Sequence, residues 1–370
     1  MVNAASLLNF GTTGLAVGDW LYSAYARTAP GYLPLNSYTT SYLVSSYPAL
    51  AAIVSPVVAP VTYAATARTL PTTATWQSIT YGNGLFVAVA RGPSNIAATS
   101  PDGITWTART LPSSQIWQSV TFGNGVFVAV AQGPSTVAAT SPDGITWTTR
   151  TLPASVNWYY VTFGNGVFLA VAYGSSSAAT SLDGITWTAR TMPSAANWNI
   201  ATYGNGVFVA AAWLSSATAV SADNGATWTS GALPSSGQWN GITFGNGVFV
   251  AVPYGGTAAA TSTNGIDWTA RTLPSSSNWV GGAFGNNTFL VIAYGSTAAA
   301  TSPDGVTWTA RTLPSSSNWI SVAFGASKFA AISTTSGTIA ASIDYAVTAT
   351  TFVLPVVPAR FGTTAYVKAT

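Results

Sequence analysis

A phrase of about 40 residues repeats through most of this chain, and each copy opens at a tryptophan. Successive copies begin 40 or 41 residues apart. The opening tryptophans are Trp76, Trp117, Trp158, Trp198, Trp239, Trp279 and Trp319. A repeat of this length predicts that each copy folds as one small unit that buries its apolar face against its neighbours. We number the copies unit 1 to unit 7 by these tryptophans.

Turn chemistry divides each unit into four short strands. In unit 2, residues 117–123 favour a first strand A, and Asn124-Gly125 favours a tight hairpin because both positions suit positive φ. Residues 126–131 follow as an apolar strand B, and residues 136–141 as strand C. Pro142-Asp143-Gly144 then predicts a second tight turn before strand D at 145–152. Four antiparallel strands per unit predict an all-β fold, a seven-bladed β-propeller.

Composition excludes several classes of function. The chain is 48% hydrophobic and 5% charged, yet its apolar residues lie in short runs, which predicts strands rather than membrane insertion. Its net charge of +3 forms no basic cluster, so we expect no nucleic-acid partner. The chain has no His, Cys or Glu, so general acid–base chemistry would rest on eight Asp, Tyr or Lys. We therefore predict no catalytic residues, no metal site and no cofactor.

The second turn carries a recognisable phrase, S-x-D-x-G-x-T-W, which residues 221–228 match letter for letter. The array resembles sialidase-like propellers, whose Asp-box (BNR) repeats have this phrase. The resemblance implies that the boxes are structural and lie away from the active face. We expect each box side chain to accept backbone N–H bonds within its own turn, and the box tryptophans to pack between blades. The box positions are Asp102, Asp143, Asp183, Asp223, Asn264 and Asp304.

One arginine per unit recurs after the box, in the phrase A-R-T-L-P or a variant of it. These residues are Arg68, Arg109, Arg150, Arg190, Arg271 and Arg311. A sialidase needs three arginines that converge on the substrate carboxylate, whereas we expect these on separate outer strands. Charges on edge strands that discourage sheet-to-sheet aggregation explain them better, and the absence of Glu also argues against sialidase activity.

The two ends of the chain do not carry the repeat. Their phrases Gly18-Asp19-Trp20, Pro30-Gly31-Tyr32-Leu33 and, near the other end, Thr350-Thr351-Phe352 resemble the halves of a phage tail-fibre collar domain. The resemblance implies a propeller inserted into a small collar-like β domain, and a homotrimer. The expected domains are an N-terminal arm (1–16), a first collar half (17–59), the propeller (60–348) and a second collar half (349–370).

Residues 61–70 read as a strand D that lacks its own A, B and C strands, whereas unit 7 lacks a strand D. We therefore expect this early segment to supply the outer strand of the last blade and close the ring.

Residues that break the repeat mark candidate ligand contacts. They follow strand B, and we expect the B–C and D–A connections to share one face, opposite the boxes. Aromatic rings beside Ser and Asn on that face would suit sugar binding, although ordinary loop decoration also explains them. Trp213, followed by Leu214, is the most conspicuous. The candidates are Arg91, Tyr173, Trp213, Tyr254 and Tyr294.

These features together predict a non-enzymatic virion protein of a phage tail fibre or tail tip, made in the host cytoplasm. It would bind other tail subunits and a host-surface glycan or protein, with repeated weak contacts multiplied by oligomeric display. Two alternatives remain open. A purely structural virion protein would bury the propeller faces against neighbours. A glycoside hydrolase would need two carboxylates about 5–9.5 Å apart across one pocket.

Overall fold

The computed structural model describes residues 61–335 and 337–347, which form strands and turns only. No helix able to span a membrane occurs in this part of the chain. The predicted arm (1–16) and both predicted collar halves (17–59 and 349–370) lie outside the described residues. The strands up to unit 4 are β1 (Val61–Gly82), β2 (Leu85–Arg91), β3 (Ser94–Ser100), β4 (Thr107–Gly123), β5 (Val126–Gln132), β6 (Pro134–Ser141), β7 (Thr148–Gly164), β8 (Val167–Ser181), β9 (Thr188–Gly204), β10 (Val207–Ala212) and β11 (Ser215–Ser221). The later strands are β12 (Thr229–Gly237), β13 (Trp239–Gly245), β14 (Val248–Pro253), β15 (Ala258–Ser262), β16 (Thr269–Thr272), β17 (Asn278–Gly285), β18 (Thr288–Ser302), β19 (Thr309–Gly325), β20 (Lys328–Ser333) and β21 (Gly337–Val347).

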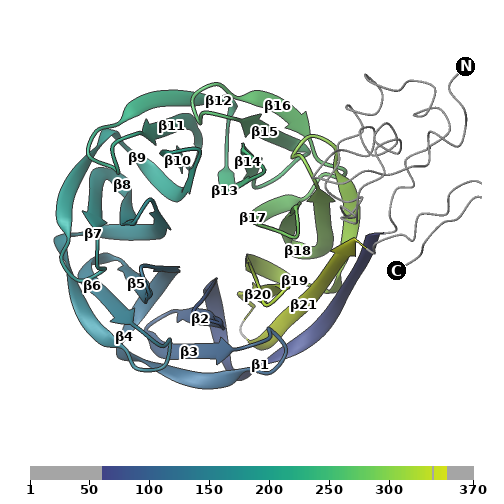
Figure 1. The fold of residues 1–370 in the computed structure, drawn as a ribbon, viewed down its shortest axis with the longest axis horizontal. Helices are drawn as coiled ribbons and strands as arrows, with labels where there is room; N and C mark the ends of the chain where they lie inside the picture. The colour runs from purple at the N-terminus through teal and green to yellow at the C-terminus, as the bar shows by residue number, and fades with distance from the viewer. Residues whose placement is uncertain (1–60, 336, 348–370) are drawn as a thin grey trace, which may run out of the picture. The chain divides into compact units, whose positions relative to one another are not determined.

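Within a unit, each strand pairs antiparallel with the next along the chain. Unit 2 pairs the end of β4 with β5, β5 with β6, and β6 with the start of β7. Unit 5 repeats this order with β13, β14, β15 and β16. Figure 1 shows these sets arranged around a ring, with strands such as β2, β5, β14 and β20 toward its centre. The fold is therefore a β-propeller, as the repeat predicted.

Most connections between units differ from the prediction, because β4, β7, β9 and β19 each serve two units without a break. The predicted strand 145–152 was wrong at both ends. Strand β7 begins only at Thr148, because the backbone N–H groups of Ile145 and Thr146 donate to Asp143 Oδ1 at 2.9 and 2.8 Å rather than to a strand. It continues to Gly164 because the residues after the outer strand keep pairing, as Asn157 does opposite Pro134.

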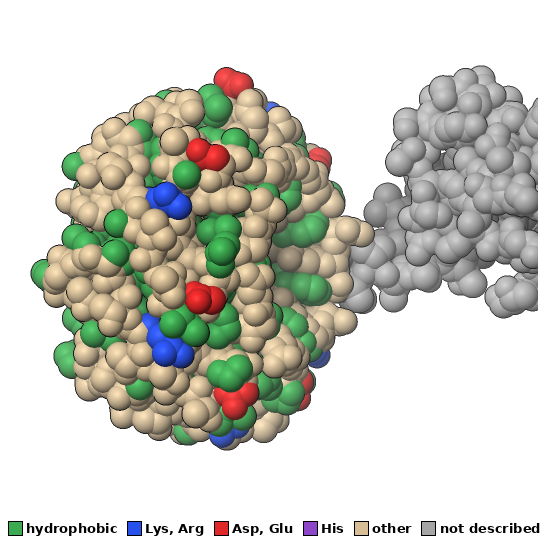
Figure 2. Space-filling model, turned by 60° about the vertical axis from the view of Figure 1, so that its left-hand side comes forward, with side chains coloured by type: hydrophobic (Ala, Val, Ile, Leu, Met, Phe, Trp, Pro, Cys, Tyr) green, Lys and Arg blue, Asp and Glu red, His purple; other side chains and the backbone are tan. Residues whose placement is uncertain are grey.

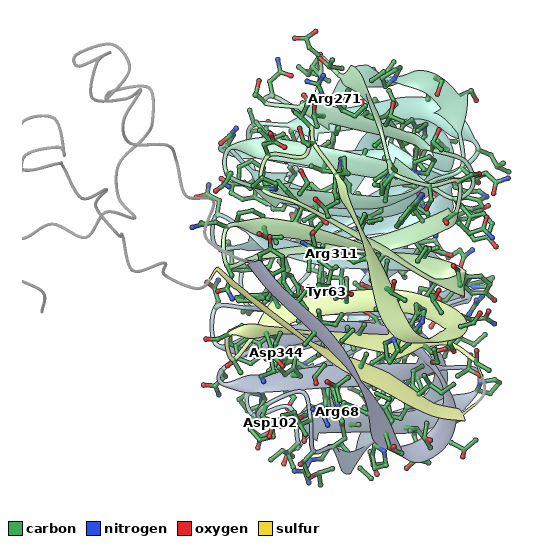
Figure 3. The ribbon with its side chains drawn as sticks, turned by 90° about the vertical axis from the view of Figure 1, so that its right-hand side faces the viewer. Tyr63, Arg68, Asp102, Arg271, Arg311 and Asp344 are labelled. Atoms are coloured by element: carbon green, nitrogen blue, oxygen red, sulfur yellow. The ribbon has the colours of Figure 1, made fainter. Side chains whose placement is uncertain are left out.

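The first described strand joins unit 7 to unit 1. The last part of β1 pairs with β2, and β1 also pairs with β21. Near this seam, Arg68 Nε donates to Ser342 Oγ at 2.8 Å, and the Arg311 guanidinium lies 5.3 Å from the centre of the Tyr63 ring. Figure 3 shows β1 running beside β21, with Tyr63 and Arg311 close together. Burial of Tyr63 raises the pKa of its phenol to about 12, although the charge of Arg311 opposes this.

A glycine at the end of each inner strand lets neighbouring units approach closely. A Cβ on Gly123 would lie 2.1 Å from the ring of Phe163 in the next unit, and one on Gly82 would lie 2.0 Å from Phe122. The same relation closes the ring, because a Cβ on Gly325 would lie 2.0 Å from the ring of Tyr81 in unit 1. The aromatic-glycine pair at the end of each inner strand thus places every ring against the glycine of the preceding unit.

The core lies between the sheets of successive units. All seven opening tryptophans are buried, each with at most 1% of its surface exposed. One cluster joins Val87 and Val89 of unit 1 to Trp117 and Phe127 of unit 2, and also includes the box residue Trp147. This packing repeats from unit to unit. Each sheet therefore packs one face against the preceding unit and the other face against the following unit.

Candidate functional site

A cavity of about 590 Å³ lies where the ends of the second strands meet the starts of the inner strands. Two positions of the repeat supply most of its lining: the residue after the opening tryptophan and the residue after strand B. The lining residues are Gln132, Asn157, Tyr159, Tyr173, Asn199, Trp213, Asn240, Tyr254, Val280, Tyr294 and Ile320.

A β-bulge places the residue that follows each opening tryptophan. In unit 3, Trp158 pairs with Ala172 and Tyr160 with Val171, so Tyr159 between them has no cross-strand partner. The same skip occurs at Asn199 in unit 4 and at Asn240 in unit 5. A bulge turns its extra residue away from the regular alternation of the strand. Here the extra residues of units 3 to 7 line the cavity.

The structure brings four of the five candidate residues together. Tyr173, Trp213, Tyr254 and Tyr294 all line the cavity and are half-buried. Arg91 is exposed and is not part of the lining, although its charge acts on Tyr159. Burial raises the pKa of the Tyr159 phenol, and the positive charge of Arg91 opposes that shift. Arg91 therefore stands beside the cavity, not within its wall.

Aromatic rings form a continuous arc along one side of the cavity. The centroids of Trp213 and Tyr254 are 6.0 Å apart, and those of Tyr254 and Tyr294 are also 6.0 Å apart. Tyr159 and Tyr173 form a second pair at 5.3 Å. These separations are within the range in which aromatic rings contact one another. The arc thus presents several ring faces and edges within one cavity.

Backbone hydrogen bonds hold the arc in place. The N–H of Trp213 donates to the carbonyl of Asn197 at 2.9 Å, and the N–H of Tyr254 donates to the carbonyl of Gln238 at 2.7 Å. Each acceptor directly precedes an opening tryptophan that is buried in the core. The aromatic side chains therefore project from backbone anchored to the inner strands. Trp213 lies in the turn between β10 and β11, as predicted from the sequence, whereas Tyr173 and Tyr294 lie within the long strands β8 and β18.

Sequence analysis missed the amide side of the cavity. Gln132, Asn199 and Asn240 line it, but none was singled out. Asn199 and Asn240 had a signal in the repeat, because the residue after the recurrent opening tryptophan varies among Gln, Tyr, Asn, Val and Ile. Without the bulge, however, alternation along the strand does not show which of these residues reaches the cavity.

The box side chains are occupied within their own turns, on the other face. Asp102 Oδ1 accepts the backbone N–H groups of Ile104 and Thr105 at 2.8 and 3.0 Å and the hydroxyl of Ser100 at 3.0 Å. These bonds hold its pKa below the usual range although desolvation opposes them, and Asp143 and Asp183 behave alike. Asn264 Oδ1 accepts the same kind of backbone bonds without a charge. None of these residues belongs to the cavity lining.

The recurrent arginines form hydrogen bonds within their own units. Arg109 Nε donates to Thr99 Oγ1 at 3.0 Å, across the pair formed by β3 and β4. Arg150, Arg190, Arg271 and Arg311 each bond the equivalent threonine. Figure 2 shows Asp and Lys or Arg side chains scattered singly over the side of the ring. The arginines are therefore braces between strands and do not converge on one ligand.

No family model and no curated protein matches this chain. Among the residues that the structure describes, no group of three His, Cys, Asp or Glu could hold a metal ion. Solved structures with a similar fold include a streptogramin B lyase, with a TM-score of 0.69 and 13% identity over 77% of this chain and 98% of that one. A second is a catalytically inactive virginiamycin B lyase from Staphylococcus aureus with quinupristin (TM-score 0.68, 13% identity, 76% and 99% covered). A third is YCF48 bound to D1 peptide (TM-score 0.61, 19% identity, 76% and 96% covered). At these identities the likeness concerns the β-propeller fold alone.

Proposed function

We propose that this chain is a phage tail-fibre or tail-tip protein that attaches the virion to a glycan on the host surface. In this proposal a seven-bladed propeller is inserted into a collar-like domain formed by residues 17–59 and 349–370. The observation that carries the proposal is the cavity, where an arc of aromatic rings meets a set of amide side chains.

The chemistry of that lining suits a sugar better than most other ligands. A pyranose ring has an apolar face that packs on aromatic side chains, and hydroxyl groups that bond amides. Trp213, Tyr254 and Tyr294 supply the aromatic surface, while Asn199 and Asn240 supply amides. A pocket with a mostly apolar lining and a few placed polar groups is the usual form of a small-ligand site.

We propose binding without catalysis. Glycoside hydrolysis uses two carboxylates that face each other across the scissile bond. Among the residues that the structure describes, the cavity lining carries no carboxylate, and the box aspartates engage their own turns. The similarity in fold to lyases does not carry their chemistry to this chain, because the identity is only 13%.

Weak sugar binding becomes useful when several copies act together. The collar resemblance implies a homotrimer, which would present three cavities on one fibre and bind other tail subunits through its remaining surface. A second binding event on the same cell surface is then effectively intramolecular, which raises avidity above the affinity of one site.

Binding of the purified full chain to a panel of bacterial cells and to a glycan array tests the proposal. Trp213→Ala and Tyr254→Ala remove parts of the arc. Ile145→Ala is the matched control, because Ile145 is 43% exposed and follows a box turn outside the cavity lining. We expect saturable binding that both cavity variants lose and the control keeps.

The alternative to attachment is a purely structural role in the virion. A folded oligomer that binds neither cells nor glycans, or that binds equally well in all three variants, would refute attachment through this cavity. Labelling of intact particles with an antibody to the chain then separates a tail location from any other.

A further inference from the structure

Two walls of unlike chemistry face the cavity. Trp213, Tyr254 and Tyr294 come from successive units and form the aromatic arc. Asn199 and Gln132 are amides at the two variable positions of the repeat. A ligand that fills the space therefore contacts rings and amide groups at the same time.

The side-chain oxygen of Asn199 has no hydrogen-bond partner, and the orientation of the amide group is fixed. It is 4% exposed, and its Nδ2 donates to the backbone carbonyl of Trp239 at 3.0 Å and to Asn240 Oδ1 at 3.2 Å. Because a backbone carbonyl can only accept, the nitrogen must face Trp239. The other atom, Asn199 Oδ1, is buried and has no hydrogen-bond partner.

Two glutamine side-chain oxygens are also buried without a hydrogen-bond partner. Gln132 Oε1, in the cavity lining, is buried without a partner. Gln118 holds the position in unit 2 that Tyr159 holds in unit 3, and its Oε1 is also without a partner, but Gln118 lies outside the cavity lining. A buried acceptor without a partner costs free energy that a suitable donor recovers. Asn199 Oδ1 and Gln132 Oε1, which belong to residues of the cavity lining, are both acceptors, so a complementary ligand brings hydrogen-bond donors.

The charges around the cavity indicate which kind of hydrogen-bond donor a ligand would carry. An ammonium group would also suit aromatic rings and oxygen acceptors. However, none of the described residues that line the cavity is a carboxylate, and Arg91 places a positive charge beside Tyr159. A carboxylate on the ligand would instead face the unpartnered oxygens of Asn199 and Gln132. Hydroxyl groups on an uncharged ring avoid both conflicts.

We propose that the cavity selects an uncharged pyranoside, which packs one ring face on Trp213, Tyr254 and Tyr294. Free hydroxyls of the same sugar donate to Asn199 Oδ1 and Gln132 Oε1. This inference rests on the proposed attachment function and names its ligand class. It also predicts selection against sugars whose hydroxyls are blocked or whose ring carries a charge.

Titration calorimetry on the full chain tests this selection with methyl hexopyranosides and short neutral oligosaccharides. The comparison ligands are deoxy and O-methyl analogues, an amino sugar and a uronic acid. We expect a neutral sugar to bind, with roughly tenfold weaker binding when the recognised hydroxyl is removed or methylated. Preferred binding of the amino sugar or the uronic acid would overturn the inference.

A protein variant gives the reciprocal test. Gln132→Met keeps the length of the side chain and removes the acceptor, so affinity for the neutral sugar should fall roughly tenfold. It should bind the deoxy analogue as well as the unchanged protein does. Gln115→Met is the matched control, because Gln115 lies outside the cavity lining. Equal affinity in both variants contradicts a role for Gln132 Oε1.

The outcomes separate the two proposals. Cell binding that depends on Trp213, with preference for a charged sugar or for no sugar at all, leaves attachment standing and refutes the uncharged pyranoside. Cell binding that does not depend on Trp213, together with no sugar binding, refutes both.

Discussion

The two faces of the ring differ in how far their residues vary from unit to unit. On one face, the hairpin turns and box turns recur with little change in most units, and side chains such as Asn124 and Asp102 bond within the ring. On the other face, the positions that line the cavity change from unit to unit, and two of their polar atoms, Gln132 Oε1 and Asn199 Oδ1, have no partner. We call these the turn face and the cavity face.

The difference shows which positions of the repeat are constrained by assembly. Asn124 on the turn face has φ of 45°, and its Nδ2 donates to the carbonyls of Gly166 and Leu182 in the next unit, at 2.9 and 2.8 Å. Asn124 thus adopts the positive φ that the hairpin needs and also supplies hydrogen bonds to the next unit. Cavity-face side chains such as Tyr173 or Trp213 meet neither requirement, so their identity is free for ligand contact.

The largest expected loss of stability comes from replacing the glycine that packs against the aromatic ring of the next unit. In Gly123→Ala the added methyl group would lie 2.1 Å from Phe163, a half-buried ring whose displacement would disturb its packing against the buried Phe168. Overpacking of this kind costs about 3 kcal/mol. We expect a large fall in the melting temperature, measured by scanning calorimetry.

Gly337→Ala is the matched control, because its new methyl group would have no neighbour closer than 3.6 Å. If Gly123→Ala melts at the same temperature as this control, close approach between units does not constrain the turn face.

A smaller effect separates the two roles of Asn124. Asn124→Gly keeps the positive φ at low cost and loses both bonds to unit 3, whereas Asn124→Ala loses the same bonds and leaves a Cβ at a φ that Ala tolerates less well than Asn. We expect a loss of about 1 kcal/mol for Gly and about 2 kcal/mol for Ala in the free energy of unfolding, measured by denaturant titration. Equal losses would show that φ carries no cost here. Unit 7 already has Ala326 at this position with φ of 47°, so the turn can form without Asn.

The sequence predicts the turn face well because its residues act locally. Asn-Gly and the box phrase determine φ and hydrogen bonds within a few residues, so strand order and the β-propeller follow from them. The ends of the strands are predicted less well from the sequence, because they depend on competition between different hydrogen-bond partners for the same backbone groups. At Ile145 the backbone N–H bonds a carboxylate, whereas at Asn157 the chain pairs with a strand from the same sheet.

The cavity face could be predicted only in part. Aromatic residues such as Trp213 stood out because they replace small loop residues of the other units. Asn199 and Asn240 did not, because their position appears as one more strand residue until the bulge is known. The unpartnered oxygen of Asn199 is a property of three-dimensional packing that no spacing in the sequence shows.

On the cavity face we expect stability and binding to separate. Trp213→Ala removes a half-buried ring whose main aromatic contact is Tyr254 at 6.0 Å, so the free energy of unfolding should fall by about 1 kcal/mol or less. Binding to cells should be lost. A melting temperature as low as that of Gly123→Ala would show that this face is also structural.

The smallest expected effect concerns acid and a single box carboxylate. Asp223 accepts bonds from the Thr227 hydroxyl and backbone N–H and from Ser221, and these hold its pKa at about 2. Because this folded pKa lies below the unfolded value of about 3.9, the ionised group stabilises the fold above about pH 4. That contribution is lost as the pH falls through about 2. Asp223→Asn should therefore be less stable than the unchanged chain at neutral pH.

The gap between the two proteins should close between about pH 4 and pH 2, when thermal unfolding is followed across that range. Asn264, which accepts two backbone N–H bonds in the same turn of unit 5, shows that an amide can fill the position. The variant should therefore fold, and only its dependence on pH should differ. A gap that stays constant down to pH 2 would mean that the charge of Asp223 contributes nothing, and that the turn face is held by geometry alone.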